Sequence, residues 1–337
     1  MTVHADAVTH LEKQDALRLL RMMLLIRRFE EASVELYQRN LIPGFIHPGI
    51  GEEAVHVGVC DLLQDGDHVI ATHRGHGQAL ARGVDPAALM AEILGRATGT
   101  QGGRGGSLHI GDWKHGVLPA SPLVGGGLGT MTGIALAHQY RRDRGVAVCF
   151  FGDGALNRGS FHEALNMAAS WQLPILYACI DNGWAISVPR RASTAGELVA
   201  RAQAYGIPGM VADGKNVLAC RGVAESAIAR ARDGGGPSLI FFDCPRGYGH
   251  EEGDSQGYRD PADIETAKLR DPLPHAYREF AERNLITPAE QAELEFQTDT
   301  IVRSAVEFAM SSPNPEASTA FDHVFPDSRS GPSQMPR

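Results

Sequence analysis

Residues 146–182, VAVCFFGDGALNRGSFHEALNMAASWQLPILYACIDN, give the clearest indication of the fold class. Residues 146–151 and 174–180 are continuous apolar runs, which are typical of strands buried on both faces of a parallel sheet. Residues 160–170 between them are expected to form a helix. Chain chirality makes the crossover of such a unit right-handed. The stretch therefore predicts a strand–helix–strand unit of an α/β fold.

The same alternation continues on both sides of this unit. Downstream we expect a helix over residues 218–233 and a third strand over 238–242, and upstream residues 68–72 have the pattern of a short buried strand. Residues 11–40 carry apolar side chains at helical spacing, which indicates one long amphipathic helix or two. Another helix is expected to begin near Gly51. Together these patterns predict a doubly wound parallel sheet flanked by helices.

Three parts of the chain are distinguished by their composition. We expect an N-terminal helical segment over residues 1–40 and a single α/β domain over residues 41–325. Residues 326–337, PDSRSGPSQMPR, contain turn formers and few apolar groups, so we expect them to form a flexible tail.

The composition excludes several classes of protein. The 337 residues include 31 basic and 40 acidic side chains, giving a net charge of −9, whereas a sequence-independent nucleic-acid binder needs a basic surface. No apolar run reaches the roughly 18 residues of a membrane helix. Five widely spaced cysteines form no disulfide or zinc pattern, and the N-terminus lacks the order of a secretory signal. We therefore expect a cytoplasmic enzyme that binds neither nucleic acid nor membrane.

Glycine marks two further segments. Residues 99–133 are unusually rich in glycine, which indicates loops that backbone or ligand must approach closely, although ordinary surface loops remain an alternative. Residues 209–215, GMVADGK, imitate a nucleotide-binding loop, but Asn216 replaces the Ser or Thr that binds Mg²⁺ and a Pro-Gly turn precedes the segment. We therefore expect no phosphate-binding loop at 209–215.

Polar residues follow both of the strands that are predicted within residues 146–182. Gly152-Asp153-Gly154 comes after the first strand and Asp181-Asn182 after the second. Ligands of doubly wound sheets bind beyond the carboxyl ends of the strands, so Asp153 and Asn182 could face one site. Their oxygens suit Mg²⁺, which prefers oxygen ligands and phosphates, and the glycines allow backbone to approach a diphosphate. The alternative is two unrelated turns.

These residues resemble a known motif. The run from GDG to the asparagine near residue 182 is similar to the thiamine diphosphate motif. GFIHPGIGEEA, ATHRGHGQALARG, GRGGSLHI, VGGGLGTMTGIALA and RGYGHEEGDSQGYR resemble further blocks, in family order from about residue 44 to 260. The family is that of alpha subunits of the thiamine diphosphate-dependent decarboxylating (dehydrogenase) component of 2-oxo-acid dehydrogenase complexes, in the pyruvate and acetoin branch. The resemblance implies the diphosphate-binding domain of the thiamine diphosphate-binding fold.

The same resemblance implies the binding residues. It implies a metal held by Asp153, Asn182 and the carbonyl of Trp184, and a backbone contact from Val124 to the aminopyrimidine ring. The residues implied beside the diphosphate are His73, Arg74, Gly152, Gly154 and Ala155, with His250 completing the cofactor site.

Two histidines are expected to take part in catalysis. His76 in HRGHG and His250 in GYGHEEGD match family positions at the thiazolium end of the cleft. Thiamine chemistry requires a proton or a positive field where a carbonyl oxygen becomes an alkoxide, and an imidazole titrates near neutral pH.

A partner is also implied, because the chain contains no pyrimidine-binding domain. In the family that it resembles, the glutamate that activates the cofactor lies on a separate beta subunit. We therefore expect an assembly of two alpha and two beta chains, with this chain inactive alone, and a lipoyl acyltransferase or carrier protein as a further partner.

The sequence is compatible with three functions. The first is cleavage of the bond next to a carbonyl in a pyruvate-like 2-oxo acid or acetoin, followed by transfer of the two-carbon acyl unit to a lipoyl carrier. The second, suggested by the unusual Ser121-Pro122-Leu123 segment, is transfer of a ketol fragment from a ketose phosphate to a carrier-protein thiol. The third is a non-enzymatic scaffold, which the retained site residues disfavour. Glu251 follows His250 where animal mitochondrial relatives carry a regulatory serine, so we expect no kinase control there.

Overall fold

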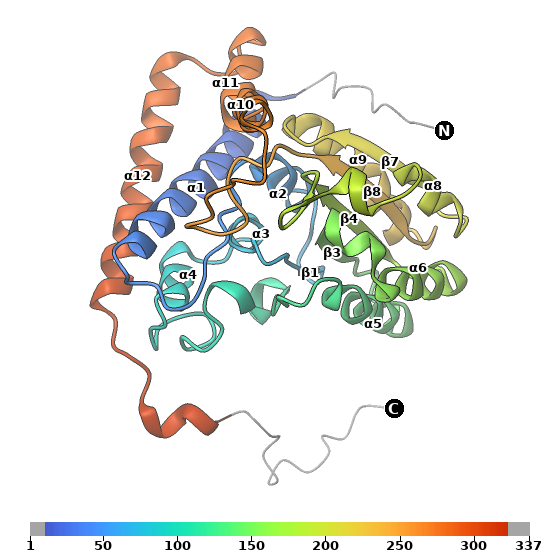
Figure 1. Cartoon of the computed structure of the whole chain (residues 1–337), viewed down its shortest axis with the longest axis horizontal. Coiled ribbons are helices and arrows are strands. Elements are labelled where there is room, and N and C mark those ends of the chain that lie inside the picture. Colours follow the sequence, from blue (N-terminus) through green and yellow to red (C-terminus); the bar gives the residue numbers. More distant parts are fainter. Residues whose placement is uncertain (1–10, 323–337) are drawn as a thin grey trace.

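The computed structural model describes residues 11–322, so the predicted tail at 326–337 lies outside the described residues. A six-stranded parallel sheet forms the centre, in the order β2-β1-β3-β4-β8-β7, with a separate antiparallel hairpin β5-β6 (Figure 1). This confirms the predicted α/β fold class. The strands are β1 (His68–Ile70), β2 (Val117–Leu118), β3 (Ala147–Gly152), β4 (Ile175–Asp181), β5 (Trp184–Ala185), β6 (Val188–Pro189), β7 (Gly209–Asp213) and β8 (Ser238–Asp243).

The central strands are apolar throughout because helices cover both faces of the sheet. In β3, Val148 and Phe150 belong to one hydrophobic cluster, which also contains residues of α1, α2 and α9. The alternate residues Cys149 and Phe151 belong to a second cluster, which is packed against α5 and α6. Alternation of side chains along a strand places neighbours on opposite faces. Both faces are therefore buried, as the continuous apolar runs predicted.

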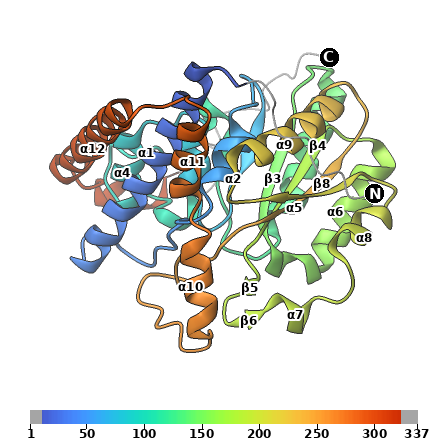
Figure 2. The ribbon, with the colours of Figure 1, turned by 90° about the horizontal axis from the view of Figure 1, so that it is seen from above.

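The helices surround the sheet and extend to one side of it (Figures 1 and 2). Among residues 11–322, none is both long and apolar enough to cross a membrane. The helices are α1 (Lys13–Gln38), α2 (Glu53–Cys60), α3 (His76–Ala81), α4 (Pro86–Ile93), α5 (Gly126–Arg141), α6 (Gly159–Trp171), α7 (Arg190–Ser193), α8 (Leu198–Gln203), α9 (Val217–Arg232), α10 (Pro261–Leu269), α11 (Pro272–Glu282) and α12 (Pro288–Ser311). Short 3₁₀ segments lie at Ser107–His109, Trp113–His115, Asp153–Asn157 and Ala317–Phe321.

The N-terminal apolar pattern forms one helix, α1, rather than two. Its buried face shares a core with the sheet, and it packs against α12. The buried Arg27 of α1 binds Glu53 at 2.7 Å and Asp271 at 2.8 Å, which ties α1 to the start of α2 and to the residue that caps α11. The helix is therefore continuous with the α/β core in packing.

Strand β7 was missed by the sequence analysis. It occupies Gly209–Asp213, at the start of the segment that imitates a nucleotide-binding loop. β7 is the edge strand beside β8, so only alternate residues are buried, in contrast to the wholly apolar central strands. A five-residue strand that begins with glycine lacks the continuous apolar run by which the others were recognised.

The start of the glycine-rich segment folds around one buried carboxylate. Glu92 of α4 is fully buried and accepts hydrogen bonds from four backbone N–H groups. The donors are Gln101 at 2.7 Å, Gly103 at 2.9 Å, Gly105 at 2.7 Å and Gly106 at 3.2 Å. This part of the segment is therefore an ordered loop whose backbone approaches a side chain closely, as its glycine content indicated.

Candidate functional site

A cavity of about 200 Å³ lies at the carboxyl ends of β1, β3 and β4. Its walls come from the segments that follow these three strands, from the loop before α5, and from the segment after β8. This is the edge at which doubly wound sheets bind ligands. The cavity brings together ten of the residues predicted from sequence: His73, Arg74, Val124, Gly152, Asp153, Gly154, Ala155, Asn182, Trp184 and His250.

Asp153 is the most unusual group in this cavity. It is 1% exposed, and its Oδ2 has no hydrogen-bond partner among the described residues. Burial, and then the neighbouring Asp181 carboxylate, raise the pKa of Asp153 to about 7. An ionised carboxylate left unpaired in a buried site is costly unless a cation or donor meets it. The site therefore fits a bound cation.

Asn182 supplies a second oxygen to the same cavity. Its Oδ1 accepts the backbone N–H of Trp184 at 3.2 Å, and its Nδ2 donates to Glu52 at 3.4 Å. An amide oxygen has two lone pairs, so this oxygen keeps capacity for a metal. A carboxylate and an amide oxygen form a donor set that suits a hard divalent cation such as Mg²⁺.

Arg74 joins two loops that flank the cavity. The buried guanidinium donates to the carbonyls of Pro48 at 2.9 Å, Gly249 at 3.4 Å and His250 at 3.1 Å. Its Nε also lies 3.6 Å from a carboxylate oxygen of Glu52. Arg74 therefore holds the backbone of His250 in place while it contributes positive charge to the cavity.

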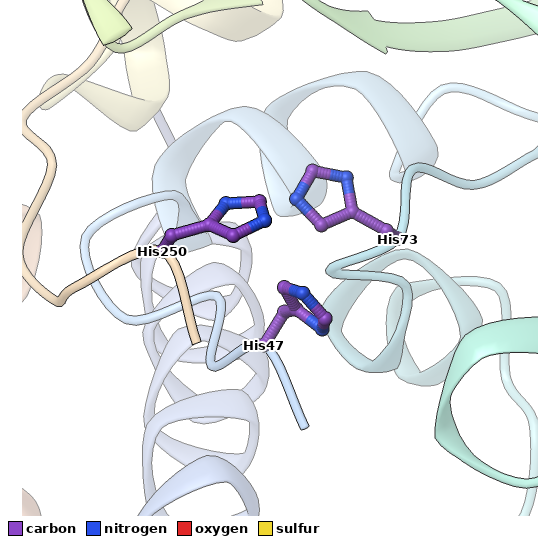
Figure 3. Close-up of side chains that lie close together, drawn as sticks. All are labelled: His47, His73 and His250. Carbon is purple, nitrogen blue, oxygen red and sulfur yellow. The ribbon is translucent and has the colours of Figure 1, made fainter. Parts of the chain in front are cut away.

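Three imidazole rings meet beside the cavity (Figure 3). The rings of His47, His73 and His250 point toward one another, and one nitrogen from each lies within 4.8 Å of the others. Burial, and then the charge of Arg74, lower the pKa of His47 to about 3 and that of His250 to about 4, and place that of His73 well below its usual range. All three rings are therefore neutral at pH 7.

His47 was not predicted as a site residue. It lies in the GFIHPGIGEEA block used for the resemblance, so the signal that could have found it was present. Its Nδ1 is buried and has no hydrogen-bond partner in the described part of the chain, and the same holds for Nε2 of His73.

Acid should destabilise the chain through these histidines. Their folded-state pKa values are depressed, so the unfolded chain binds protons first as the pH falls below about 6.5. The folded state therefore keeps its full stability above pH 6.5 and loses stability as the pH falls toward the folded-state pKa values of about 4 and about 3. We expect His47→Gln to flatten the decrease in Tm between pH 6.5 and 4, measured by calorimetry on the metal-free chain.

A matched control for that experiment is His162→Gln, on the exposed surface of α6. It should keep the original dependence of Tm on pH. An unchanged slope in His47→Gln would show that the cluster does not titrate as described.

His76 is not brought into the cavity. It is fully buried at the start of α3, and both ring nitrogens are occupied. Nδ1 lies 2.8 Å from Glu30 of α1, and Nε2 lies 2.9 Å from the hydroxyl of Ser107. The turn into α3 directs this side chain toward α1, whereas His73, three residues earlier, lines the cavity. His76 therefore links α1 to the end of the loop held by Glu92.

Comparison with known proteins identifies the family of the chain. Residues 21–318 match the family described as the dehydrogenase E1 component. The alpha subunit of acetoin:2,6-dichlorophenolindophenol oxidoreductase from Bacillus subtilis is 43% identical over 94% of this chain and 95% of its own length. The subunit of the same name from Cupriavidus necator is 40% identical over 94% and 96%. The pyruvate dehydrogenase E1 component subunit alpha of Porphyra purpurea is 38% identical over 94% and 95%.

These matches confirm the resemblance drawn from the sequence and the predicted class, a thiamine diphosphate-dependent oxidoreductase. The chain belongs to the dehydrogenase E1 component family and is similar over nearly its whole length to that family's alpha subunits.

Proposed function

We propose that this chain is the alpha subunit of a thiamine diphosphate and Mg²⁺ dependent enzyme that cleaves the bond next to a carbonyl in acetoin or a pyruvate-like 2-oxo acid. The two-carbon acyl unit then passes to a lipoyl carrier. The observation that carries the proposal is the buried, unpaired carboxylate oxygen of Asp153 in the cavity at the carboxyl edge of the sheet. The names of the relatives favour acetoin and pyruvate among possible substrates.

In this proposal the residues that line the cavity bind either the metal ion or the cofactor. When bound, thiamine diphosphate supplies a thiazolium carbon that stabilises negative charge next to the substrate carbonyl. Asp153, Asn182 and the carbonyl of Trp184 would hold Mg²⁺. The residues that would bind the cofactor itself are His73, Arg74, Val124, Gly152, Gly154, Ala155 and His250.

The proposed catalytic group of this chain is His250. Its ring is neutral at pH 7 because burial and Arg74 lower its pKa, so its unprotonated nitrogen can accept a proton and the imidazolium can return it. Arg74 positions it through the carbonyl of the same residue. His76 becomes a positioning residue, because Glu30 and Ser107 already occupy both of its ring nitrogens.

A beta subunit is proposed to cover one face of α5 and the mouth of the cavity. Gly129 and Gly133 are exposed there, and a Cβ added at either would meet no atom within 4 Å. Tyr140 on the same face is 88% exposed, and Leu123 and Val124 at the mouth of the cavity are also exposed. An apolar face with small residues allows a partner helix to approach closely. The beta subunit would bring the activating glutamate in an assembly of two alpha and two beta chains.

A larger side chain on this face should separate folding from assembly. Gly133→Gln removes a glycine from a helix interior, so we expect the isolated chain to gain about 0.5–1 kcal/mol of stability. The same side chain would obstruct the partner and weaken association by at least about tenfold, or 1.4 kcal/mol. Calorimetry of the isolated chain and sedimentation of the alpha–beta mixture measure the two effects.

The control is Ala229→Gln on the exposed side of α9. It adds a side chain of the same kind on the other face of the sheet and should leave the assembly intact. Normal assembly of Gly133→Gln would place the beta subunit on another surface.

The substrate is tested with the purified alpha–beta pair. Acetoin, pyruvate and a ketose phosphate are each supplied with thiamine diphosphate and Mg²⁺, using lipoyl and phosphopantetheinyl acceptors. We expect acyl transfer from acetoin or pyruvate to the lipoyl acceptor. Activity confined to the ketose phosphate would support ketol-fragment transfer instead. If calorimetry detects no binding of the cofactor, the non-enzymatic scaffold would be the better interpretation.

A further inference from the structure

A second cavity of about 310 Å³ lies between the β5-β6 hairpin, α7 and α10. These elements lie side by side in Figure 2. It shares Asn182 and Trp184 with the first cavity but is lined mainly by other residues. Five arginines from separate segments converge on it: Arg190, Arg191, Arg246, Arg259 and Arg270.

Three of these arginines have acidic partners. Arg190 binds Asp181 at 2.9 Å, and Arg270 binds Asp243 at 3.0 Å. Arg246 lies 3.6 Å from a carboxylate oxygen of Asp254. Their positive charge is therefore at least partly balanced.

The other two arginines lack an acidic group at ion-pair distance among the described residues, although Asp254 and Asp263 attract Arg259 from farther away. Within residues 11–322, neither Arg191 nor Arg259 forms an ion pair with an acidic residue. Arg191 is exposed at the rim, whereas Arg259 is 7% exposed and donates to the carbonyl of Arg246 and to Gln256. The only acidic side chain among the described lining residues is Asp263, which is exposed on α10. The cavity therefore holds an excess of positive charge.

The buried arginines also keep unused donors. The Nε atoms of Arg246 and Arg259 are buried and find no hydrogen-bond partner among residues 11–322, and both residues are less than one-tenth exposed. Buried donors of native proteins are normally satisfied by protein, water or ligand. Arg246 and Arg259 thus carry buried charges that their neighbours only partly satisfy, and an anion in the adjoining cavity would offset them.

We propose that this cavity binds the phosphate group of a small phosphorylated molecule, at a site that adjoins the proposed coenzyme cavity. Guanidinium groups match the oxygens of phosphate in fork geometry, and several of them can share one dianion. The concave shape and the convergence of separate segments favour a small molecule over a protein surface, which would meet a flat patch.

Binding there would act on the neighbouring site through Trp184. The guanidinium of Arg259 lies over the Trp184 ring at 5.8 Å, and Tyr258 packs against the same ring at 5.6 Å. Arg246 donates to the hydroxyl of Tyr258 at 2.7 Å. An anion held by Arg246 and Arg259 would fix the hairpin that carries Trp184 against the segment that carries His250. Tryptophan fluorescence therefore reports occupancy.

The test is a titration of the full-length chain with inorganic phosphate at constant ionic strength, followed by calorimetry and tryptophan fluorescence. We expect saturable binding with a change in fluorescence, and at least tenfold weaker binding for Arg191→Gln and for Arg259→Gln. Arg191 is exposed, so its variant keeps the fold even if the buried variant does not. Arg144→Gln, on a distant exposed arginine paired with Asp233, should bind phosphate normally.

Three results would overturn the proposal. Binding that is unchanged in Arg191→Gln would place the phosphate elsewhere, including in the coenzyme cavity. Equally strong binding of acetate would remove the preference for phosphate. The absence of saturable binding would leave the arginines as a surface for a larger anionic partner. Because the titration needs neither thiamine diphosphate nor Mg²⁺, it stands apart from the test of the proposed function.

Discussion

Replacing Asp153 by alanine is expected to abolish metal-dependent binding of thiamine diphosphate while the chain stays folded. The carboxylate is 1% exposed, and its Oδ2, which has no hydrogen-bond partner among the described residues, is the ligand atom that the proposed Mg²⁺ would bind. Loss of this ligand should weaken binding by at least about 100-fold, or roughly 2.7 kcal/mol. Calorimetric titration of the alpha–beta pair with thiamine diphosphate and Mg²⁺ measures the loss.

The same substitution should not reduce stability in the absence of metal. Burial and Asp181 raise the pKa of Asp153 to about 7, which means that its ionised form is unfavourable in the folded chain. The Tm of metal-free Asp153→Ala should therefore equal or exceed that of the original chain.

The control for this prediction is Asp213→Ala, at the end of edge strand β7. Asp213 is also a strand-end aspartate, but it is exposed and pairs with Lys215. Its variant should bind the coenzyme normally. Undiminished binding by Asp153→Ala would remove the metal site from this cavity, and with it the observation that carries the proposed function.

Replacing Glu92 by alanine is expected to be the most destabilising change outside the site. Four backbone N–H groups, from Gln101 to Gly106, lose their acceptor at once. Charge-assisted hydrogen bonds contribute more than neutral ones, and unsatisfied donors carry a desolvation penalty. We expect the free energy of unfolding to fall by on the order of 4 kcal/mol, measured by urea denaturation.

Two variants sharpen this second prediction. Glu92→Gln keeps one acceptor oxygen for two of the N–H groups but turns an NH2 group toward the other two, so it should also be strongly destabilising. Glu265→Ala removes an exposed carboxylate that pairs with Lys268, and should change stability by less than about 0.5 kcal/mol. If Glu92→Ala is as mild as Glu265→Ala, the loop does not depend on this carboxylate.

The loop also connects to the proposed site. Ser107 directly follows the residues held by Glu92, and its hydroxyl lies 2.9 Å from Nε2 of His76. Disorder in the loop would therefore release one side of His76, which we propose as a positioning residue.

Much of this arrangement followed from local pattern. Strands β3, β4 and β8 were predicted because their apolar runs are continuous, and strands buried on both faces must be apolar throughout. The meeting of Asp153 and Asn182 followed from the same logic, since the carboxyl ends of neighbouring parallel strands share one edge. The identity of the cofactor, thiamine diphosphate, was then predicted from the resemblance of the motifs.

Side-chain direction at loops could not be predicted in this way. His73 and His76 belong to one short motif, yet His73 lines the cavity and His76 points to α1, because α3 begins between them. His47 approaches His250 although 203 residues separate them, through a loop whose conformation no periodicity encodes. Edge strand β7 was not predicted because alternate residues are exposed, so its sequence has no continuous apolar run.

The amino-acid order alone predicted the class of fold and the sheet edge at which a site is proposed, because strand burial and strand-end residues are local properties of the chain. The cofactor family came from the resemblance of its motifs. Tertiary packing brings the ring of His47 to those of His73 and His250, lets Glu92 organise the glycine-rich loop, and places five arginines spread over 81 positions (190 through 270) around one cavity. Such groupings depend on how distant segments pack, and their energies arise from burial and charge that exist only after folding.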